Sequence, residues 1–179
     1  MALGGGSFIA QNKELPGAYM NFVSAASASA TLSDRGIATM PLELDWGKEG
    51  EVFEVTNEDF QKNSMKVFGY AFDSPKLKGL GDLFMGAMTL YVYRLNGGGE
   101  KASNDYATAL YSGTRGNVLN IVIQANADDA TLFDVSTYLG AVKVDLQTVA
   151  KAGELVANDY VKFKADAELA VTAATPLTG

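Results

Sequence analysis

The sequence lacks both cysteine and histidine. Without cysteine the chain can form neither disulfide bonds nor thiolate metal sites, and it gives no clue to its redox compartment. Without histidine it cannot form a Ser-His-Asp or Cys-His catalytic relay, and it loses the usual general base near neutral pH. Zinc sites built from Cys and His are excluded as well. We therefore expect no metal, no cofactor and no enzymatic activity.

Positive charge and long apolar runs are also scarce. The 14 Lys and Arg residues face 21 Asp and Glu residues, which gives a formal net charge of -7. A nucleic-acid-binding protein needs a surplus of Lys and Arg on one face, so we expect no nucleic-acid partner. No run reaches the roughly 18 apolar residues of a membrane span, and the N-terminus lacks a secretory signal pattern. The sequence predicts synthesis in a cytoplasm and no membrane span.

The first residues indicate an extended arm over residues 1–17. This segment contains three consecutive glycines and few sizeable apolar side chains, too few to fold back on a core of their own. A frayed terminus is the alternative. Against it stand Phe8 and Ile9, which a purely solvated tail would not need. Leu15 precedes a Pro-Gly pair, and a weakly alternating strand then carries Tyr19 and Phe22.

Residues 18–98 mix strand and helix signals and indicate a mixed α/β domain. Strand-like runs cover residues 37–46, 51–55 and 88–95. Pro41 lies inside the first, which predicts an edge strand or a bulge because proline cannot donate to a ladder. Thr56 can cap one helix and Ser74 another. The second helix has an apolar stripe, which we expect to share one core with Trp46: Leu77, Leu80, Leu83 and Phe84.

The run NGGGE at residues 96–100 is the strongest linker signal in the chain. Three adjacent glycines resist order, so we place a hinge at Gly97, Gly98 and Gly99 and the boundary between residues 18–98 and 99–179. A nucleotide-binding loop is a poor alternative. Glu100 separates the glycines from Lys101, and no Ser or Thr follows that lysine directly.

Residues 99–179 read as an antiparallel β-sandwich. Strand patterns cover residues 131–139, 141–149, 160–165 and 168–173, and residues 151–157 allow a short helix. Two further apolar strands flank a turn at residues 112–117, within residues 106–126. A hairpin or domain-crossing turn is favoured there over an anion-binding loop, because no helix with Lys and Ser/Thr follows. Asp128 and Asp129 could act as an acid–base pair, but adjacent carboxylates at a turn are usually only solvated.

Several stretches, taken together, resemble a known family. They are ALGGGSF, LPGAYMNFVS, LSDRGIATMPLELDWG, PKLKGLGDLF, TLYVYRLNGGGEKASNDYATALYSGTRGN and ELVANDYVKF, in this order over nearly the whole chain. The sequence is similar to the tail sheath proteins of contractile phage tails and of R-type bacteriocins of Gram-positive bacteria, typified by PBSX-like prophages. The long block from TLYVYRL to SGTRGN is the most specific. The resemblance covers the N-terminal half of such proteins.

The resemblance implies an α+β fold, with a mixed α/β domain followed by a β-sandwich. It implies a structural subunit that assembles with itself into a helical sheath and contracts to drive a tail tube through a target envelope. The implied partners are other copies, the tube protein, and baseplate or tail terminator proteins. In the family the arm adds a strand to a neighbouring subunit, which would bury Phe8 and Ile9. The resemblance implies that this sequence stops where the β-sandwich ends and lacks the C-terminal half that completes the family's core.

A binding module is the alternative, in which the β-sandwich holds a receptor or carbohydrate for a phage or bacteriocin particle. Clustered exposed aromatic side chains would favour it. The tyrosines of this region instead fall along separate strands, which suits core or cross-strand packing better: Tyr106, Tyr111, Tyr138 and Tyr160. The sequence leaves an enzyme only as a carboxylate hydrolase, for which no motif supplies a third acidic group.

Overall fold

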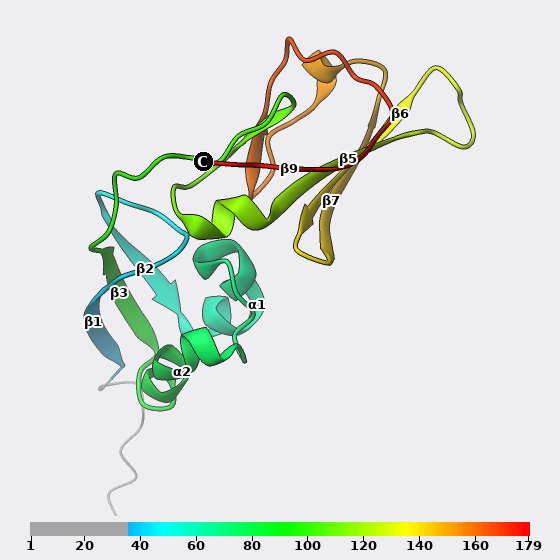
Figure 1. Cartoon of the computed structure of the whole chain (residues 1–179). Coiled ribbons are helices and arrows are strands. Elements are labelled where there is room, and N and C mark those ends of the chain that lie inside the picture. The colour runs from blue at the N-terminus through cyan, green and yellow to red at the C-terminus, as the bar shows by residue number, and fades with distance from the viewer. Residues whose placement is uncertain (1–35) are drawn as a thin grey trace, which may run out of the picture. The chain divides into compact units, whose positions relative to one another are not determined.

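The structure is a computed structural model, and it describes residues 36–179 (Figure 1). These residues all belong to one compact unit. The predicted arm over residues 1–17 lies outside the described residues, as does the strand predicted after it. So do the side chains proposed for contacts between subunits: Phe8, Ile9, Leu15, Tyr19 and Phe22.

The first part of the chain forms a three-stranded sheet in the order β1-β3-β2. The strands are β1 (Ile37–Leu42), β2 (Val52–Thr56) and β3 (Thr89–Arg94). β1 pairs with β3 in parallel, and β2 pairs with β3 in antiparallel orientation. β1 lies at an edge of the sheet, as Pro41 predicted.

Two helices cover one face of this sheet (Figure 1). α1 (Asn57–Phe68) begins at Thr56, whose side chain accepts a hydrogen bond from the Asp59 N–H, and it ends at Gly69 in the left-handed conformation. Ser74 caps a short 3-10 helix, η2 (Pro75–Leu77), which leads into α2 (Lys78–Phe84). Both predicted caps are confirmed.

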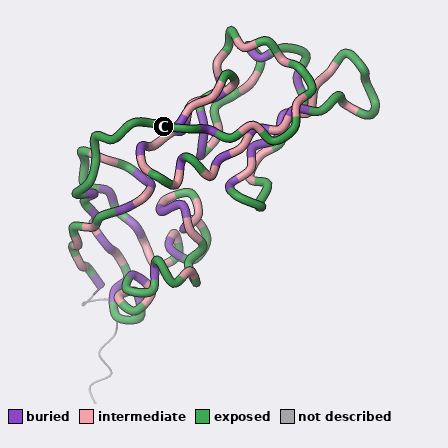
Figure 2. The backbone as a smooth tube through the Cα atoms, in the orientation of Figure 1, coloured by how far each residue is buried: buried purple, intermediate pink, exposed green. Residues whose placement is uncertain are grey.

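The sheet and helices enclose an apolar core, which we call the first core: Leu44, Phe53, Val55, Phe60, Phe68, Leu77, Leu80, Phe84, Leu90 and Val92. Buried residues alternate with more exposed ones along β2 and β3, as the colours of Figure 2 show. Leu83 is only partly buried. The prediction that Trp46 shares this core was wrong, because Trp46 packs in the other core of the molecule.

All the strand pairs of the second part are antiparallel. A four-stranded sheet has the order β7-β6-β5-β9, and a separate two-stranded ladder joins β4 to β8. The bounds are β4 (Ala107–Ala109), β5 (Leu119–Ala125), β6 (Phe133–Leu139), β7 (Val142–Val149), β8 (Val161–Phe163) and β9 (Thr172–Pro176). The second core lies among these strands and includes Leu119, Ile121, Ile123, Val135 and Val161.

Two sequence predictions for this part need correction. Residues 106–126 do not form a hairpin, since β4 and β5 belong to different sheets and a 3-10 helix, η3 (Thr114–Val118), lies between them. The last strand starts at Thr172, later than the predicted start at residue 168. A short helix appears within residues 151–157 as η4 (Ala152–Glu154). The predicted α+β class, a mixed α/β part followed by a β-sandwich, is confirmed.

Candidate functional site: the junction between the two parts

The candidate functional site is the junction, where residues 36–95 contact residues 97–179. Trp46 lies at its centre and is fully buried. Its ring meets Tyr111 edge-on at 5.2 Å between centroids and stacks on Tyr160 at 6.3 Å. Its indole N–H donates to the Lys66 carbonyl of α1, at 3.1 Å. Trp46 therefore fills the second core while remaining bonded to the first part.

Glycines allow the backbones to approach closely on either side of Trp46. Gly47 has φ of 111°, and a β-carbon there would lie 2.6 Å from the Val67 carbonyl oxygen. Gly113 has φ of 119°, and a β-carbon there would collide with the Asp45 carbonyl. Within the turn at residues 112–117, Gly113 alone has positive φ. The turn needs this glycine for its conformation and for the contact with Asp45.

Arg94 joins the two parts through buried hydrogen bonds. It ends β3 and is 2% exposed. Its Nη1 donates to the Gly47 carbonyl and to the Ser112 carbonyl, each at 3.0 Å. Its Nε donates to Asn96 Oδ1 at 3.3 Å. A buried guanidinium has to have its donors satisfied, and here the acceptors come from both sides of the junction.

Glu49 binds the predicted linker. Its Oε2 accepts from the Gly98 N–H at 2.8 Å and from Ser112 Oγ at 2.7 Å. The Gly98 bond, then the Ser112 bond, lower the pKa of Glu49, and the positive charges of Arg94 and Lys101 act in the same direction. Gly97 lies against the Glu49 side chain. The hinge role of Gly97, Gly98 and Gly99 stays a prediction.

Arg115 makes a further contact across the junction. Its Nε donates to the Gly69 carbonyl at 2.7 Å, at the C-terminal end of α1, and its guanidinium lies 4.5 Å from the centre of the Tyr70 ring. The Tyr70 hydroxyl donates to Asp45. Burial and then Asp45 raise the pKa of Tyr70. Two backbone N–H groups of this turn also donate to carbonyl oxygens: the Arg115 N–H to Asp45 and the Gly116 N–H to Gly113.

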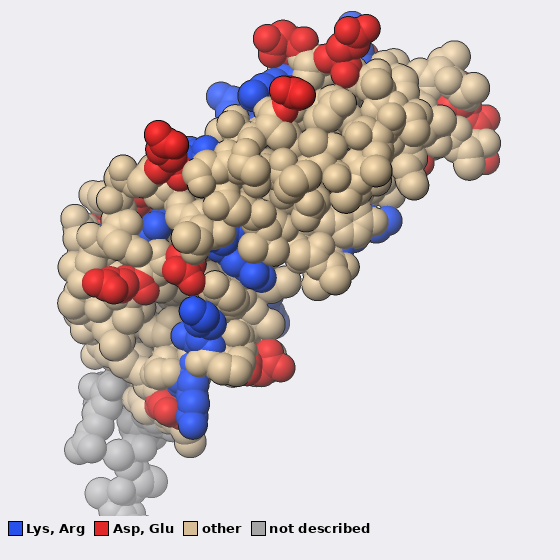
Figure 3. Space-filling model, viewed as in Figure 1, with Lys and Arg blue, Asp and Glu red and all other residues tan. Residues whose placement is uncertain are grey.

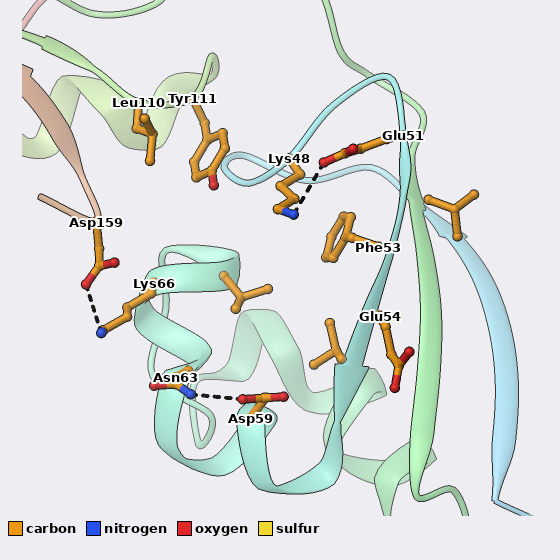
Figure 4. Close-up of a pocket in the computed structure, with 13 residues that line it drawn as sticks. Lys48, Glu51, Phe53, Glu54, Asp59, Asn63, Lys66, Leu110, Tyr111 and Asp159 are labelled. Atoms are coloured by element: carbon orange, nitrogen blue, oxygen red, sulfur yellow. Dashed lines mark hydrogen bonds and ion pairs between the residues drawn. The ribbon is translucent and has the colours of Figure 1, made fainter. Parts of the chain in front are cut away.

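A cavity of about 600 Å³ lies beside the junction, between β2, α1 and residues of the second part (Figure 4). Its charged side chains are engaged with close neighbours. Lys66 pairs with Asp159 at 2.8 Å, and Lys48 pairs with Glu51 at 3.3 Å. Asp59 accepts from Thr56 and Asn63, which lower its pKa. These carboxylates fasten α1 and the loops around it, and they are not arranged as an acid–base pair.

The other carboxylates singled out in the sequence have local partners. Asn126 Oδ1 accepts from the N–H groups of both Asp128 and Asp129. Asp129 Oδ1 accepts from Thr131, which lowers the pKa of Asp129. This arrangement closes the β5–β6 turn and is typical of a solvated loop.

A repeated motif that the sequence analysis missed builds the β4–β8 ladder. The triplet Asn-Asp-Tyr occurs at residues 104–106 and again at 158–160. Each asparagine Oδ1 accepts from the two N–H groups that start the following strand, at 2.8 to 3.0 Å. The bonds that follow are also equivalent, since Leu110 N–H donates to Tyr160 and Lys164 N–H to Tyr106. A search for short internal repeats would have found it.

The second copy of this motif contacts the first part of the chain. Its Tyr160 stacks on Trp46, and its Asp159 pairs with Lys66 of α1. The first copy, Asn104 to Tyr106, is instead tied to β9, because Asn104 Nδ2 donates to the Thr175 carbonyl. The two copies thus hold the ladder to different neighbours.

The described surface carries both signs of charge. On the face shown in Figure 3, acidic and basic side chains form small separate groups over both parts. Among residues 36–179, no helix is long and apolar enough to cross a membrane.

Both parts of the chain match models of one protein family. Residues 35–95 match the N-terminal region of domain III of the tail sheath protein Gp18, and residues 97–179 match the phage tail sheath protein beta-sandwich domain. The chain is also 40% identical over 184 residues to the phage-like element PBSX protein XkdK of Bacillus subtilis (strain 168). The chain belongs to the phage tail sheath family. Members of this family are structural proteins of the phage tail.

Solved sheath structures share the fold. The sheath tail protein of Desulfitobacterium hafniense is 38% identical and superimposes with a TM-score of 0.73 over 90% of this chain. The sheath tail protein of Listeria innocua is 32% identical, with a TM-score of 0.71 over 83% of this chain. The matched region covers 38% of XkdK and of the first of these structures, and 36% of the second. The chain spans less than two fifths of its relatives' length.

Proposed function

We propose that this chain acts as a structural subunit, or part of one, in the sheath of a contractile phage tail or bacteriocin particle. In this role it assembles with further copies around a tail tube, and contraction of the sheath drives the tube through the target envelope. The observation that carries the proposal is the match of two consecutive sheath domain models to the two parts of the fold. Synthesis in a bacterial cytoplasm precedes assembly.

The partners follow from this role. They are other copies of the sheath protein, the tube protein, and the baseplate or terminator proteins at the tail ends. We also propose that the boundary between the parts lies at the glycine-rich linker. Its support is that the two family matches meet on either side of residue 96.

The extended arm over residues 1–17 is proposed to link neighbouring subunits. Strand addition supplies main-chain hydrogen bonds for affinity and side-chain pockets for register, and Phe8 and Ile9 are the natural anchors. Deleting residues 1–15 from the full-length sheath protein tests this role. Loss of tubes in electron micrographs is expected, whereas tubes of normal yield and length would leave the arm without a linking function.

Co-expression with the tube protein tests the sheath role itself. Negative-stain images should show tubes whose outer layer disappears when the gene for this chain is removed. The competing role, a receptor-binding module in the β-sandwich, predicts intact tubes in both samples and loss of binding to the target cell instead.

A further inference from the structure

The backbone of the linker at residues 97–101 is held at one point, and the Lys101 side chain adds a bond from its Nζ to the Leu110 carbonyl. Among the described residues, the bond from the Gly98 N–H to Glu49 is the only hydrogen bond made by the backbone of this segment. Its residues are exposed, and Gly98 has φ of 83°. The next backbone fastening in the chain direction is at Ala102 and Ser103, which bond to Ala109 and Thr178. Glu49 thus fastens the backbone of residues 97–100, whereas Lys101 has its own bond to Leu110.

The same carboxylate oxygen joins three segments that are distant in sequence. Glu49 belongs to the loop between β1 and β2, Gly98 to the linker, and Ser112 to the second part of the chain. Arg94 lies beside this group and bonds the Gly47 and Ser112 carbonyls. Ser112 is fully buried and is bound through both its hydroxyl and its carbonyl.

We propose that Glu49 is a latch that orders the triple-glycine linker against the loop between β1 and β2. With the carboxylate bound to Gly98 and Ser112, the linker is fastened to this loop. When the carboxylate lets go, residues 97–100 lose their fastening, while Trp46, Arg94 and Arg115 still join the two parts of the chain. Arg94 supports the latch, because its buried positive charge favours an anion at this position.

The first test is hydrogen exchange of the linker in the complete 179-residue chain. Glu49→Ala should speed exchange at the Gly98 amide at least 10-fold and increase cleavage by a glutamate-specific protease after Glu100. Glu51→Ala is the matched control, since it removes an exposed ion pair from the same loop and should leave both rates unchanged. Equal linker exchange in the wild type and in Glu49→Ala would overturn the latch.

A second measurement reads the freedom of the two parts directly. Because the chain has no cysteine, cysteines introduced at Lys62 in α1 and Lys143 in β7 can carry spin labels specifically. The distance distribution between them should stay narrow in both Glu49→Ala and Glu51→Ala, because Trp46, Arg94 and Arg115 still join the two parts. A broader distribution in Glu49→Ala would contradict the proposal, because the two parts and not the linker alone would then be released.

A conservative variant covers the case in which Glu49→Ala fails to fold. Glu49→Gln keeps an oxygen that can accept both bonds and removes only the charge. It should exchange faster than the wild type at Gly98, by a factor smaller than for Glu49→Ala where both fold. Wild-type exchange at the Gly98 amide in a folded Glu49→Gln protein would show that the carboxylate is not a latch.

Discussion

Trp46 and Arg94 decide, at the scale of single residues, how the two parts of this sheath chain meet. Neither role is evident from local sequence. Trp46 ends a strand-like run, and a buried indole there could equally pack on α1 or on the second core. Arg94 alternates with Leu90 and Val92 on the inward face of β3, where a charge would be costly without acceptors. Those acceptors come from Gly47 and Ser112, which are far apart in sequence.

Replacing Trp46 tests its place in the junction. Trp46→Ala should lower the free energy of unfolding by about 3 to 5 kcal/mol, because it leaves a cavity between Tyr111 and Tyr160. Trp46→Phe loses the bond to the Lys66 carbonyl but keeps an aromatic ring in the core. It should therefore lower the free energy of unfolding by less than Trp46→Ala does. Urea denaturation monitored by far-UV circular dichroism measures both, and a loss under about 1 kcal/mol for Trp46→Ala would place the indole outside the core.

Glu49 makes the stability of the folded chain depend on pH, and its contribution is lost in acid. The pKa of Glu49 is lowered in the folded state, chiefly by the Gly98 bond. Its contribution is therefore fully present above the ordinary pKa of a glutamate and is lost as the pH falls through the lowered value. Arg94, Lys101 and Ser112 are the groups that face it.

The stability difference between the wild type and Glu49→Gln should thus shrink as the pH falls from 7 to 3. Denaturant melts at several pH values measure this difference. A difference that stays constant or grows toward low pH would mean that the Glu49 carboxylate is not held in its charged form.

At the scale of elements, capping residues and apolar spacing predicted α1 and η2–α2 well. Thr56 and Ser74 cap where expected, and Leu77, Leu80 and Phe84 are buried. These signals are local, so sequence shows them. For the β4–β5 connection the sequence left a hairpin and a crossing turn open, because a glycine-rich turn between two apolar runs fits both, and of the two the hairpin is wrong.

Two leucines of α2, Leu80 and Leu83, belong to the same predicted apolar stripe but differ in burial. Leu80 is 5% exposed and Leu83 is only partly buried. Leu80→Ala should cost about 2 to 5 kcal/mol, and Leu83→Ala clearly less. Denaturation curves of the two variants measure these costs. An equal or larger loss of unfolding free energy for Leu83→Ala would require a different orientation of the helix.

The Asn-Asp-Tyr repeat predicts a second pair of outcomes. Asn104→Ala leaves the N–H groups of Tyr106 and Ala107 without their acceptor and should cost about 1 to 3 kcal/mol. Asn104→Asp keeps that acceptor and loses only the donor to Thr175, so it should cost less. Asp105→Ala, at an exposed neighbour, is the control. Thermal melts measure these losses. If Asn104→Ala and Asp105→Ala have the same melting temperature, the motif does not stabilise the ladder.

At the scale of the whole molecule, the order of the two parts could be predicted from strand and helix patterns, but the junction could not. Its contacts join residues that are far apart in the sequence, from 18 positions for Arg94 with Ser112 to 114 for Trp46 with Tyr160. Periodicity and capping carry no information about such pairs. The triple glycine suggested a free hinge because the sequence does not show that Glu49 lies beside Gly98.

The central claim, that the chain is part of a tail sheath, is tested most directly by immunogold electron microscopy. Antibodies raised against residues 36–179 are applied to tail particles from cells that carry this gene. The sheath role predicts gold particles along the whole length of the tail shaft. Gold confined to the baseplate or fibres, with an unlabelled shaft, would contradict it and favour a receptor-binding module.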